Sequence, residues 1–368
     1  MWSPSRTSLA AAPPIRTASS SRCWKSAARW RSSGTRGAGV SPSPRSPPWV
    51  WVPERSGFRC GCLLASAEAL SSCRWSAKSS ALLGADWGDP VKITVLIDHE
   101  ASSDTVGTEW GASIHIRWRE HSILFDTGTS GLFADNARTL GVPIEDVEFA
   151  VVSHSHLDHG GGLARFLSDT EAPVWARAGM TPDLFMKLGP IRKRVGIDAD
   201  VVADNADRFR FVERDTEVVP GVHLLTDISS DQPAPKGNRV LMREEGGRLV
   251  PDDFGHELAL VIEDEGGLVV FTGCSHHGVL NIVESVRRAF PGQSVKALIG
   301  GFHFMGIPIA GLLGDSDAAI EEVARRLRAM EIPQIITMHC TTRKGYETLR
   351  QAYGPGIAYA GAGASIEL

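Results

Sequence analysis

One short stretch, from His154 to His159, constrains this chain more than any other part of its sequence. It reads His-Ser-His-Leu-Asp-His and directly follows the apolar run 149–152. Side chains two residues apart point to the same side of an extended chain, so His154 and His156 can reach one metal ion together. The chain then turns, and Asp158 and His159 would point to a second position beside the first. Nitrogen and carboxylate ligands at this spacing suit zinc or a similar transition metal, and solvated surface histidines are seldom grouped in this way.

The composition divides the 368-residue chain near residue 90. Residues 1–90 are rich in Ser, Arg, Pro and Trp, contain no histidine and hold 12 basic against 4 acidic residues, whereas residues 91–368 hold 26 basic against 39 acidic residues. No apolar periodicity in residues 1–90 would build a helix or a strand. We therefore expect residues 1–90 to be disordered, either as a targeting tail or, as we favour, as a segment upstream of a true start near Val91.

The charge and hydropathy of the remainder exclude several classes of partner. A net negative charge argues against nonspecific binding to nucleic acid. No run of apolar residues is long enough to form a transmembrane helix. These features predict a cytoplasmic protein that acts on a small molecule, with neither a nucleic-acid nor a membrane partner.

Residues 91–368 predict a single domain of mixed α/β type. Three helices are expected, from Thr181-Pro182 to Gly189, over 279–290, and from Ser316 or Asp317 to Leu327, because their apolar residues recur at helical spacing and capping residues or proline mark their ends. Paired strands early in the chain, followed by mixed strands and helices, predict a layered sandwich rather than a strict βαβ repeat. The expected strands are 91–97, 112–118, 122–125, 148–153, 173–177, 208–212, 222–226, 257–263, 267–272, 295–300 and 334–338.

The histidine-rich stretch resembles the signature of the metallo-β-lactamase superfamily. The resemblance covers about residues 91–368 and implies an αββα sandwich with one or two metal ions at the edge between its sheets. The chain is most similar to the group of 7,8-dihydropterin-6-yl-methyl-4-(β-D-ribofuranosyl)aminobenzene 5′-phosphate synthases, whose name implies joining a dihydropterin diphosphate to an aminobenzene ribotide with loss of diphosphate. Six phrases carry this likeness: Glu109-Trp110-Gly111, Phe125-Asp126-Thr127-Gly128, His256-Glu257-Leu258-Ala259-Leu260, Thr272-Gly273-Cys274-Ser275-His276, Gly300-Gly301-Phe302-His303 and His339-Cys340-Thr341.

Further metal ligands are expected from later in the chain. His276 and His339 each follow an apolar strand, and both resemble ligand positions of the superfamily. Cys274 stands where many relatives have a bridging aspartate, and a thiolate can bind a metal but does not bridge two ions as a carboxylate does. His256 and His303 stay open, as third ligands, as substrate contacts or as structural hydrogen-bonding groups.

Three other segments have a predicted part in the site. Asp126, at the end of a strand, is expected to accept the second ring N–H of a ligand histidine rather than to bind metal itself, and it also suits an Asx turn. The basic segment 191–194 could bind phosphate or form a solvated face of the protein. The polar loop 235–238 could form the rim of a pocket.

An open metal site predicts an enzyme. A divalent ion, zinc first with manganese or iron as alternatives, lowers the pKa of bound water to about 7 and polarises a carbonyl or phosphoryl oxygen. Asp158 would orient that water or accept its proton. We therefore expect a metal-dependent hydrolase of a small ester or phosphorylated substrate, or a related synthase whose metal ions stabilise a phosphate leaving group. The alternatives are a non-catalytic metal-binding or sensor protein and a diiron redox protein of the same fold.

Overall fold

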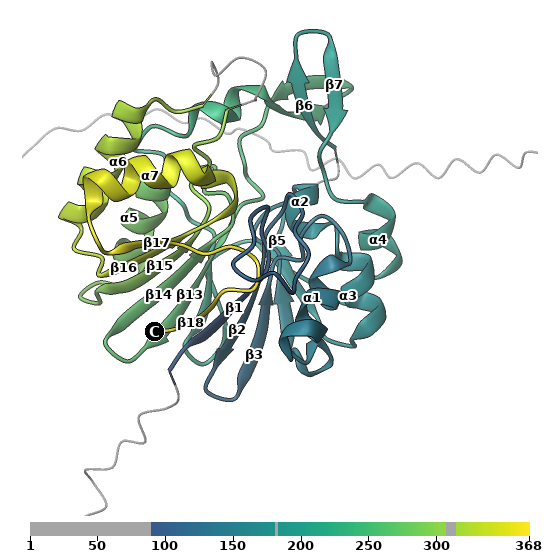
Figure 1. Cartoon of the computed structure of the whole chain (residues 1–368). Helices are drawn as coiled ribbons and strands as arrows, with labels where there is room; N and C mark the ends of the chain where they lie inside the picture. Colours follow the sequence, from purple (N-terminus) through teal and green to yellow (C-terminus); the bar gives the residue numbers. More distant parts are fainter. Residues whose placement is uncertain (1–89, 181–182, 307–313) are drawn as a thin grey trace, which may run out of the picture. The chain divides into compact units, whose positions relative to one another are not determined.

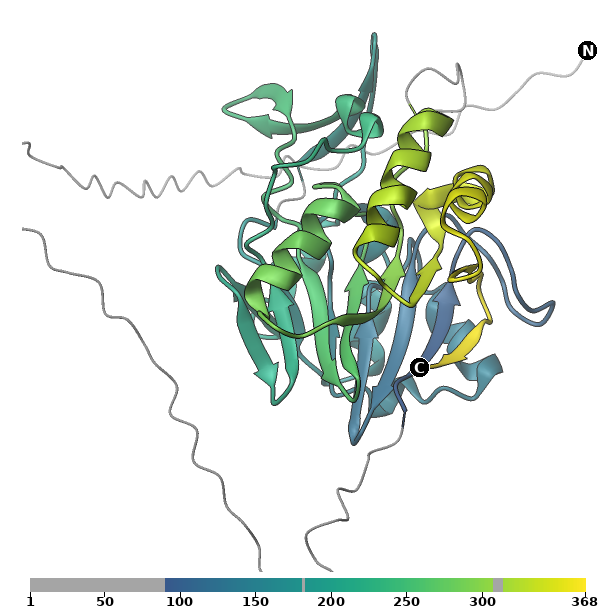
Figure 2. The ribbon, with the colours of Figure 1, turned by 90° about the vertical axis from the view of Figure 1, so that its left-hand side faces the viewer.

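The computed structural model describes residues 90–180, 183–306 and 314–368, so the predictions made for residues 1–89 lie outside the described part. Two seven-stranded sheets pack face to face, and helices cover the outer face of each (Figures 1 and 2). This is the αββα sandwich that the sequence predicts. No helix among the described residues is both long and apolar enough to cross a bilayer.

The first sheet comes mainly from residues 92–212. Its antiparallel half consists of β18 (Ser365–Glu367), β1 (Lys92–Ile97), β2 (Ser113–Trp118) and β3 (His121–Phe125), and three parallel strands follow β3: β4 (Phe149–Val151), β5 (Val174–Arg177) and β8 (Phe209–Val212). β18 pairs with β1 although the two strands lie near opposite ends of the described chain. The helical segments of this half are α1 (Leu132–Leu140), η1 (Ile144–Asp146), α2 (Leu157–Gly160), α3 (Leu163–Asp169) and α4 (Ala199–Asp204).

The second sheet repeats this division into a parallel and an antiparallel half. Its strands are, in order, β17 (Ile357–Tyr359), β16 (Gln334–Thr337), β15 (Val295–Gly300), β14 (Gly267–Thr272), β13 (Ala259–Asp264), β10 (Val222–Leu225) and β9 (Thr216–Val219). The pairs from β17 to β14 are parallel and those from β14 to β9 antiparallel. The helical segments of this half are η2 (Lys236–Val240), α5 (Val279–Ala289), α6 (Asp317–Ala329), η3 (His339–Thr341) and α7 (Thr342–Tyr353).

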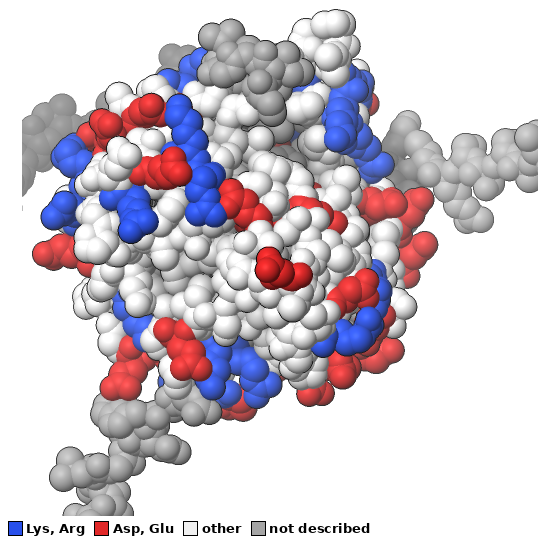
Figure 3. Space-filling view, viewed as in Figure 1, with Lys and Arg blue, Asp and Glu red and all other residues white. Residues whose placement is uncertain are grey.

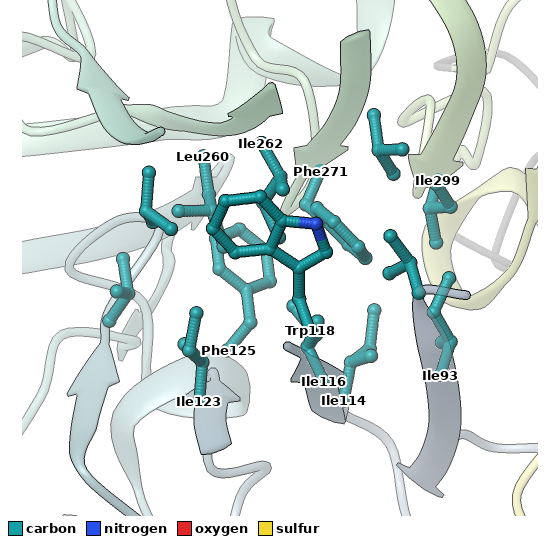
Figure 4. Close-up of a cluster of buried hydrophobic side chains, with 14 of the residues drawn as sticks. Ile93, Ile114, Ile116, Trp118, Ile123, Phe125, Leu260, Ile262, Phe271 and Ile299 are labelled. Carbon is teal, nitrogen blue, oxygen red and sulfur yellow. The ribbon is translucent and has the colours of Figure 1, made fainter. Parts of the chain in front are cut away.

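The core between the sheets is built from alternating apolar residues of facing strands. Ile114, Ile116 and Trp118 project from one face of β2 and meet Phe271 of the second sheet (Figure 4). These side chains are almost completely buried, and burial of each large apolar side chain stabilises the fold by about 1.5–3 kcal/mol. Two further apolar layers hold the helices against the sheets. One lies between the first sheet and helices α1 and α3, and the other lies between the second sheet and helices α5, α6 and α7.

Most of the predicted elements are confirmed. Each of the predicted strands overlaps an observed strand, and the predicted helices over 279–290 and from Ser316 or Asp317 are α5 and α6. The Ser316 side chain accepts a hydrogen bond from the Ala319 amide and so caps α6, as expected. The structure adds strands β9, β17 and β18 and the four strands of a third sheet, which the sequence pattern did not reveal.

A third, four-stranded sheet overturns one prediction. It consists of β12 (Arg248–Pro251), β11 (Leu241–Glu245), β6 (Leu184–Leu188) and β7 (Ile191–Arg194), and its β6–β7 hairpin projects from the sandwich (Figure 1). The helix predicted from Thr181-Pro182 to Gly189 is therefore wrong over its described residues. Leu184 and Leu188 share a face in a strand as they would in a helix, because positions four apart are in phase with both repeats.

Candidate metal centre

The predicted metal-binding side chains meet where strands of both sheets end. His154 and His156 follow β4, and Asp158 and His159 lie in α2 directly after them. Three neighbouring strands of the second sheet also end at this edge. The turn after β14 carries Cys274 and His276, the segment after β15 carries His303, and His339 begins η3 after β16. The structure thus brings residues from both halves of the chain to one edge of the sandwich, and these side chains are buried except for the half-buried Asp158.

Five overlapping groups of donor atoms converge at this edge among the described residues, and two of them contain no cysteine. Within each group all donors lie within 4.8 Å of one another. The first group is His154, His156 and His276, and the second is Asp158, His159 and His339. The Nε2 atoms of His154 and His276 are 3.3 Å apart, which is about the separation of two nitrogen ligands on a tetrahedral zinc ion.

One donor of the first group has no protein partner. The Nε2 atom of His156 is buried and makes no hydrogen bond within the described part of the chain. A buried polar atom without a partner costs free energy. A metal ion would give this atom a partner, so the residues present fit a metal centre.

In His154 and His276, whose Nε2 atoms face each other, the second ring nitrogen, Nδ1, also has a hydrogen-bond partner. His154 Nδ1 lies 2.9 Å from Ser153 Oγ, and His276 Nδ1 lies 2.9 Å from Asn238 Oδ1. Because an amide oxygen only accepts, His276 must carry its proton on Nδ1, which leaves the Nε2 lone pair directed into the site. Such partners orient metal-binding histidines and set their tautomer.

Asp126 lies against one of the candidate ligand histidines. Its Oδ2 atom lies 2.6 Å from Nδ1 of His159, so Nε2 of this histidine also faces the site. The same carboxylate accepts hydrogen bonds from the amide and the hydroxyl of Ser153, each at 2.7 Å. Asp126 thereby joins the start of the histidine-rich stretch to its end.

Asp158 is held as an ionised carboxylate. Its Oδ2 atom accepts a hydrogen bond from Nε1 of Trp110 at 3.0 Å and lies 3.3 Å from Nε2 of His339. Burial alone would raise the pKa of Asp158, but the neighbouring His159 and His339 outweigh burial and hold the pKa below its ordinary value. Trp110, which the sequence offered only as part of a resembling phrase, therefore positions this carboxylate.

The histidines of the first group are neutral at physiological pH. Burial, with help from neighbouring histidines, lowers the pKa of His154 and His276 well below the ordinary value. Burial also lowers the pKa of His156, to about 3, although Asp158 partly opposes the shift. Metal ions bind the neutral form of imidazole, so these side chains need to release no proton before binding.

Two buried carboxylates that the sequence analysis did not single out hold the ligand-bearing turns. Glu257 accepts hydrogen bonds from the backbone amides of His276 and His277, at 2.6 and 2.8 Å. Asp98 accepts from the backbone amide of His339 at 2.6 Å. The sequence held only weak signals of these two roles. Glu257 lies in one of the phrases that resemble the synthase group, and Asp98, like Asp126, directly follows an apolar strand.

The structure distinguishes His256 from His303, the two histidines whose role the sequence left open. Both ring nitrogens of His256 are engaged, with the Ser155 amide at 3.2 Å and Asp252 at 3.1 Å, and His256 belongs to none of the converging groups found among the described residues. His303 groups with Cys274 and His276, and its buried Nδ1 has no hydrogen-bond partner in the described part of the chain.

The cysteines lie beside both histidine groups. Cys274 Sγ is 3.1 Å from Nε2 of His159, and burial raises the pKa of the Cys274 thiol. Cys340, which the sequence analysis did not select as a ligand, groups with Cys274 and His339. The site therefore offers soft sulfur donors as well as nitrogen and oxygen.

Part of the candidate centre lines a pocket of about 130 Å³, and we call this part its floor: His156, Asp158, Cys274, His303 and Cys340. Trp110, which is 41% exposed, stands at one side of it, and His303 and Cys274 contribute to its lining. The loop predicted as a pocket rim is η2, whose Gly237 also lines the pocket. Apolar side chains complete the wall: Met186, Val195, Val240, Leu241 and Met305.

Comparisons with known proteins agree with this architecture. Residues 113–331 match the family model described as the metallo-beta-lactamase superfamily. The chain is 27% identical over 272 residues to a curated protein of Methanocaldococcus jannaschii named 7,8-dihydropterin-6-methyl-4-(beta-D-ribofuranosyl)-aminobenzene-5'-phosphate synthase, covering 69% of this chain and 88% of that protein.

A solved structure gives a further likeness. The crystal structure of Tm1679, described as a metal-dependent hydrolase of the beta-lactamase superfamily, superposes with a TM-score of 0.64 at 30% sequence identity, covering 76% of this chain and 99% of that one. An uncharacterized protein of M. jannaschii is 24% identical over 264 residues, covering 70% of this chain and 94% of its own length. By its fold, its clustered histidines and these matches, the chain belongs to the metallo-β-lactamase superfamily.

Proposed function

We propose that the protein is a metal-dependent hydrolase of a small ester or phosphoester, with one or two divalent ions, zinc first, as its cofactor. One observation carries the proposal: donor atoms from both sheets converge beside a pocket that His156, Asp158 and Cys274 line. Within this cluster, Nε2 of His154 and Nε2 of His276 are 3.3 Å apart. A pocket of about 130 Å³ suits part of a small molecule rather than a folded polymer.

The chain provides two sets of ligands for this cofactor. His154, His156 and His276 would hold one ion, and Asp158, His159 and His339 the other, with Cys274 beside both sets. A divalent ion bound here supplies a Lewis acid and an acidified water molecule.

Asp158 has the properties of a group that orients a water molecule and accepts its proton. It is ionised, and its Trp110 hydrogen bond restricts rotation of the carboxylate. In the proposed function Asp158 therefore serves both as a ligand and as the acceptor of a proton from the attacking water. Trp110 acts through Asp158 and is a positioning residue.

A synthase is the second candidate, favoured by the 27% identity to the curated M. jannaschii protein over 88% of its length. In that reaction the same residues would hold the cofactor against a diphosphate leaving group instead of a carbonyl or a phosphodiester. The two candidates therefore share the ligand set and differ in substrate.

The test uses the full chain, loaded in turn with zinc, manganese and ferrous iron after removal of metal by a chelator. Metal content is measured, followed by turnover of bis(p-nitrophenyl) phosphate and a panel of esters and lactones. We expect metal binding and hydrolysis, both lost in His154→Ala and kept in His121→Ala, which changes a histidine at the start of β3, outside the site. Metal binding without any turnover would contradict the hydrolase. Formation of the joined product from a dihydropterin diphosphate and an aminobenzene ribotide, with release of diphosphate, would establish the synthase.

A further inference from the structure

The third sheet forms part of the pocket wall. Met186 of β6 and Leu241 of β11 are paired across their strands, and both line the pocket. Val195, just beyond β7, lines it as well. One face of this small sheet therefore looks onto the pocket whose floor is the candidate metal centre.

Lys193 lies on the same face. It is the cross-strand partner of Met186, so the order across the sheet is Leu241, Met186, Lys193. Side chains directly opposite each other in an antiparallel pair project to the same side, and Lys193 is also in phase with Val195, two residues on. Both relations place Lys193 on the face that looks onto the pocket, next to the lining residues Met186 and Val195 but outside the lining itself.

The neighbouring basic residues of β7 are engaged elsewhere. The Arg192 guanidinium lies 3.7 Å from the centre of the Phe185 ring and forms an ion pair with Glu244, on the opposite face of the sheet. Arg194 donates to the carbonyl oxygen of Ile197. Lys193 is exposed, and no ion pair or hydrogen bond of its side chain is recorded with the residues that the structure describes. Basic side chains gather beside this hairpin in the space-filling view (Figure 3).

We infer that Lys193 binds an anionic group, a phosphate monoester in particular, at the far end of a substrate whose reactive bond lies over the candidate metal centre. The inference rests on the proposed function and adds a substrate class to it. Two residues along a strand span about 7 Å, so the ammonium group stands beyond the apolar wall formed by Met186 and Val195. The substrate would then be elongated, with an apolar middle and a charged outer end.

The experiment tests binding at the outer end of the pocket separately from binding at the candidate metal centre. The probes are two alkyl hydroxamates, one with a phosphate monoester at its far end and one with a hydroxyl. The hydroxamate end occupies the metal-loaded floor in both, and affinity for the full chain is measured by calorimetry. Lys193→Ala should weaken the phosphate probe about five- to tenfold, the size expected for one partly exposed charge-assisted contact, and leave the hydroxyl probe unchanged.

The hairpin offers a matched control. Lys187 is also exposed on the hairpin, but it pairs with Arg192 and so lies on the opposite face. Lys187→Ala should change neither affinity by more than about twofold, and Lys193→Arg should retain most of the phosphate preference because it keeps the charge.

Equal effects of Lys187→Ala and Lys193→Ala, or no effect of Lys193→Ala on the phosphate probe, would overturn the inference while leaving the proposed hydrolase intact. Binding that depends on Lys193 in a protein that hydrolyses no ester would refute the hydrolase and support the inference. If neither probe binds the metal-loaded wild-type chain, the inference fails, and the turnover measurement alone decides on the hydrolase.

Discussion

The two halves of the sandwich have the same strand pattern and supply the candidate site in different ways. Each sheet joins three consecutive parallel pairs to three antiparallel pairs, and each places the ends of its parallel strands at the shared edge. The first half offers four donors within one stretch, His154 to His159. The second half offers its donors singly, with His276, His303 and His339 at the ends of successive strands.

This difference shows what each half contributes. A contiguous motif can be recognised in a sequence, but its donors alone leave the first converging group incomplete, because His276 comes from the other sheet. Packing of the two sheets is therefore a condition for assembling the site. Variants that affect one half, or only the core between them, test this dependence.

The largest expected effect follows from removing one ligand from either half. His154→Ala and His276→Ala should each abolish most metal binding by the first group and reduce turnover by about a thousandfold, because the two rings face each other across one position. Metal content by mass spectrometry and turnover rates provide the measurement. If His276→Ala kept full metal content while His154→Ala lost it, the halves would not share an ion.

A core substitution should separate stability from metal binding. Phe271→Ala removes a fully buried ring between the sheets (Figure 4) and should lower the free energy of unfolding by about 3–5 kcal/mol. At low temperature, below its unfolding transition, this variant should still bind metal in the wild-type ratio. Thermal and urea unfolding measure the loss, and Phe211→Ala, at a 48% exposed position, is the control expected to change stability by less than about 0.5 kcal/mol.

A smaller effect is expected from the carboxylates that hold the ligand-bearing turns. Glu257→Gln and Asp98→Asn each weaken hydrogen bonds to the backbone of a ligand turn and should lower metal affinity about tenfold without abolishing binding. Competition with a chelator measures the affinity, and Glu265→Gln on an exposed turn is the control. Unchanged affinity in both variants would show that the strands alone fix the turns.

The smallest effect at neutral pH is expected at a buried histidine outside the site. Burial, with help from Arg117, lowers the pKa of His115 from 6.5 to about 4. The unfolded chain therefore binds more protons between these values, so this contribution to stability is complete above about pH 6.5 and is lost as the pH falls towards 4. His115→Gln should flatten the decline of the urea midpoint between pH 6.5 and 4 in the metal-free protein. An unchanged dependence of the urea midpoint on pH would contradict the lowered pKa of His115.

The sequence predicted the main sheets because their strands are apolar and bounded by turn residues. It failed for the third sheet, because strands β7 and β12 have only four residues each, too few to show a periodicity, and three of the four residues of β7 are basic. The helix wrongly expected up to Gly189 arose from the spacing of Leu184 and Leu188, which strand β6 satisfies as well as a helix would.

The candidate site divides in the same way. The donors from His154 to His159 were evident because their spacing is local. The parts played by Asp98 and Glu257 were not, since each depends on a hydrogen bond to a residue far along the chain: Asp98 and the amide that it holds are 241 residues apart. No local pattern records such a contact.

The pairing of β18 with β1 has a consequence for how the protein is made. The ribosome delivers β1 first and β18 only after both sheets and their helices have been synthesised, so one edge of β1 stays open through most of translation. An open strand with buried apolar residues such as Val91, Ile93 and Val95 is a site for aggregation. Closure of the first sheet is thus a late event in biogenesis, because the strand that covers this edge of β1 comprises residues 365–367.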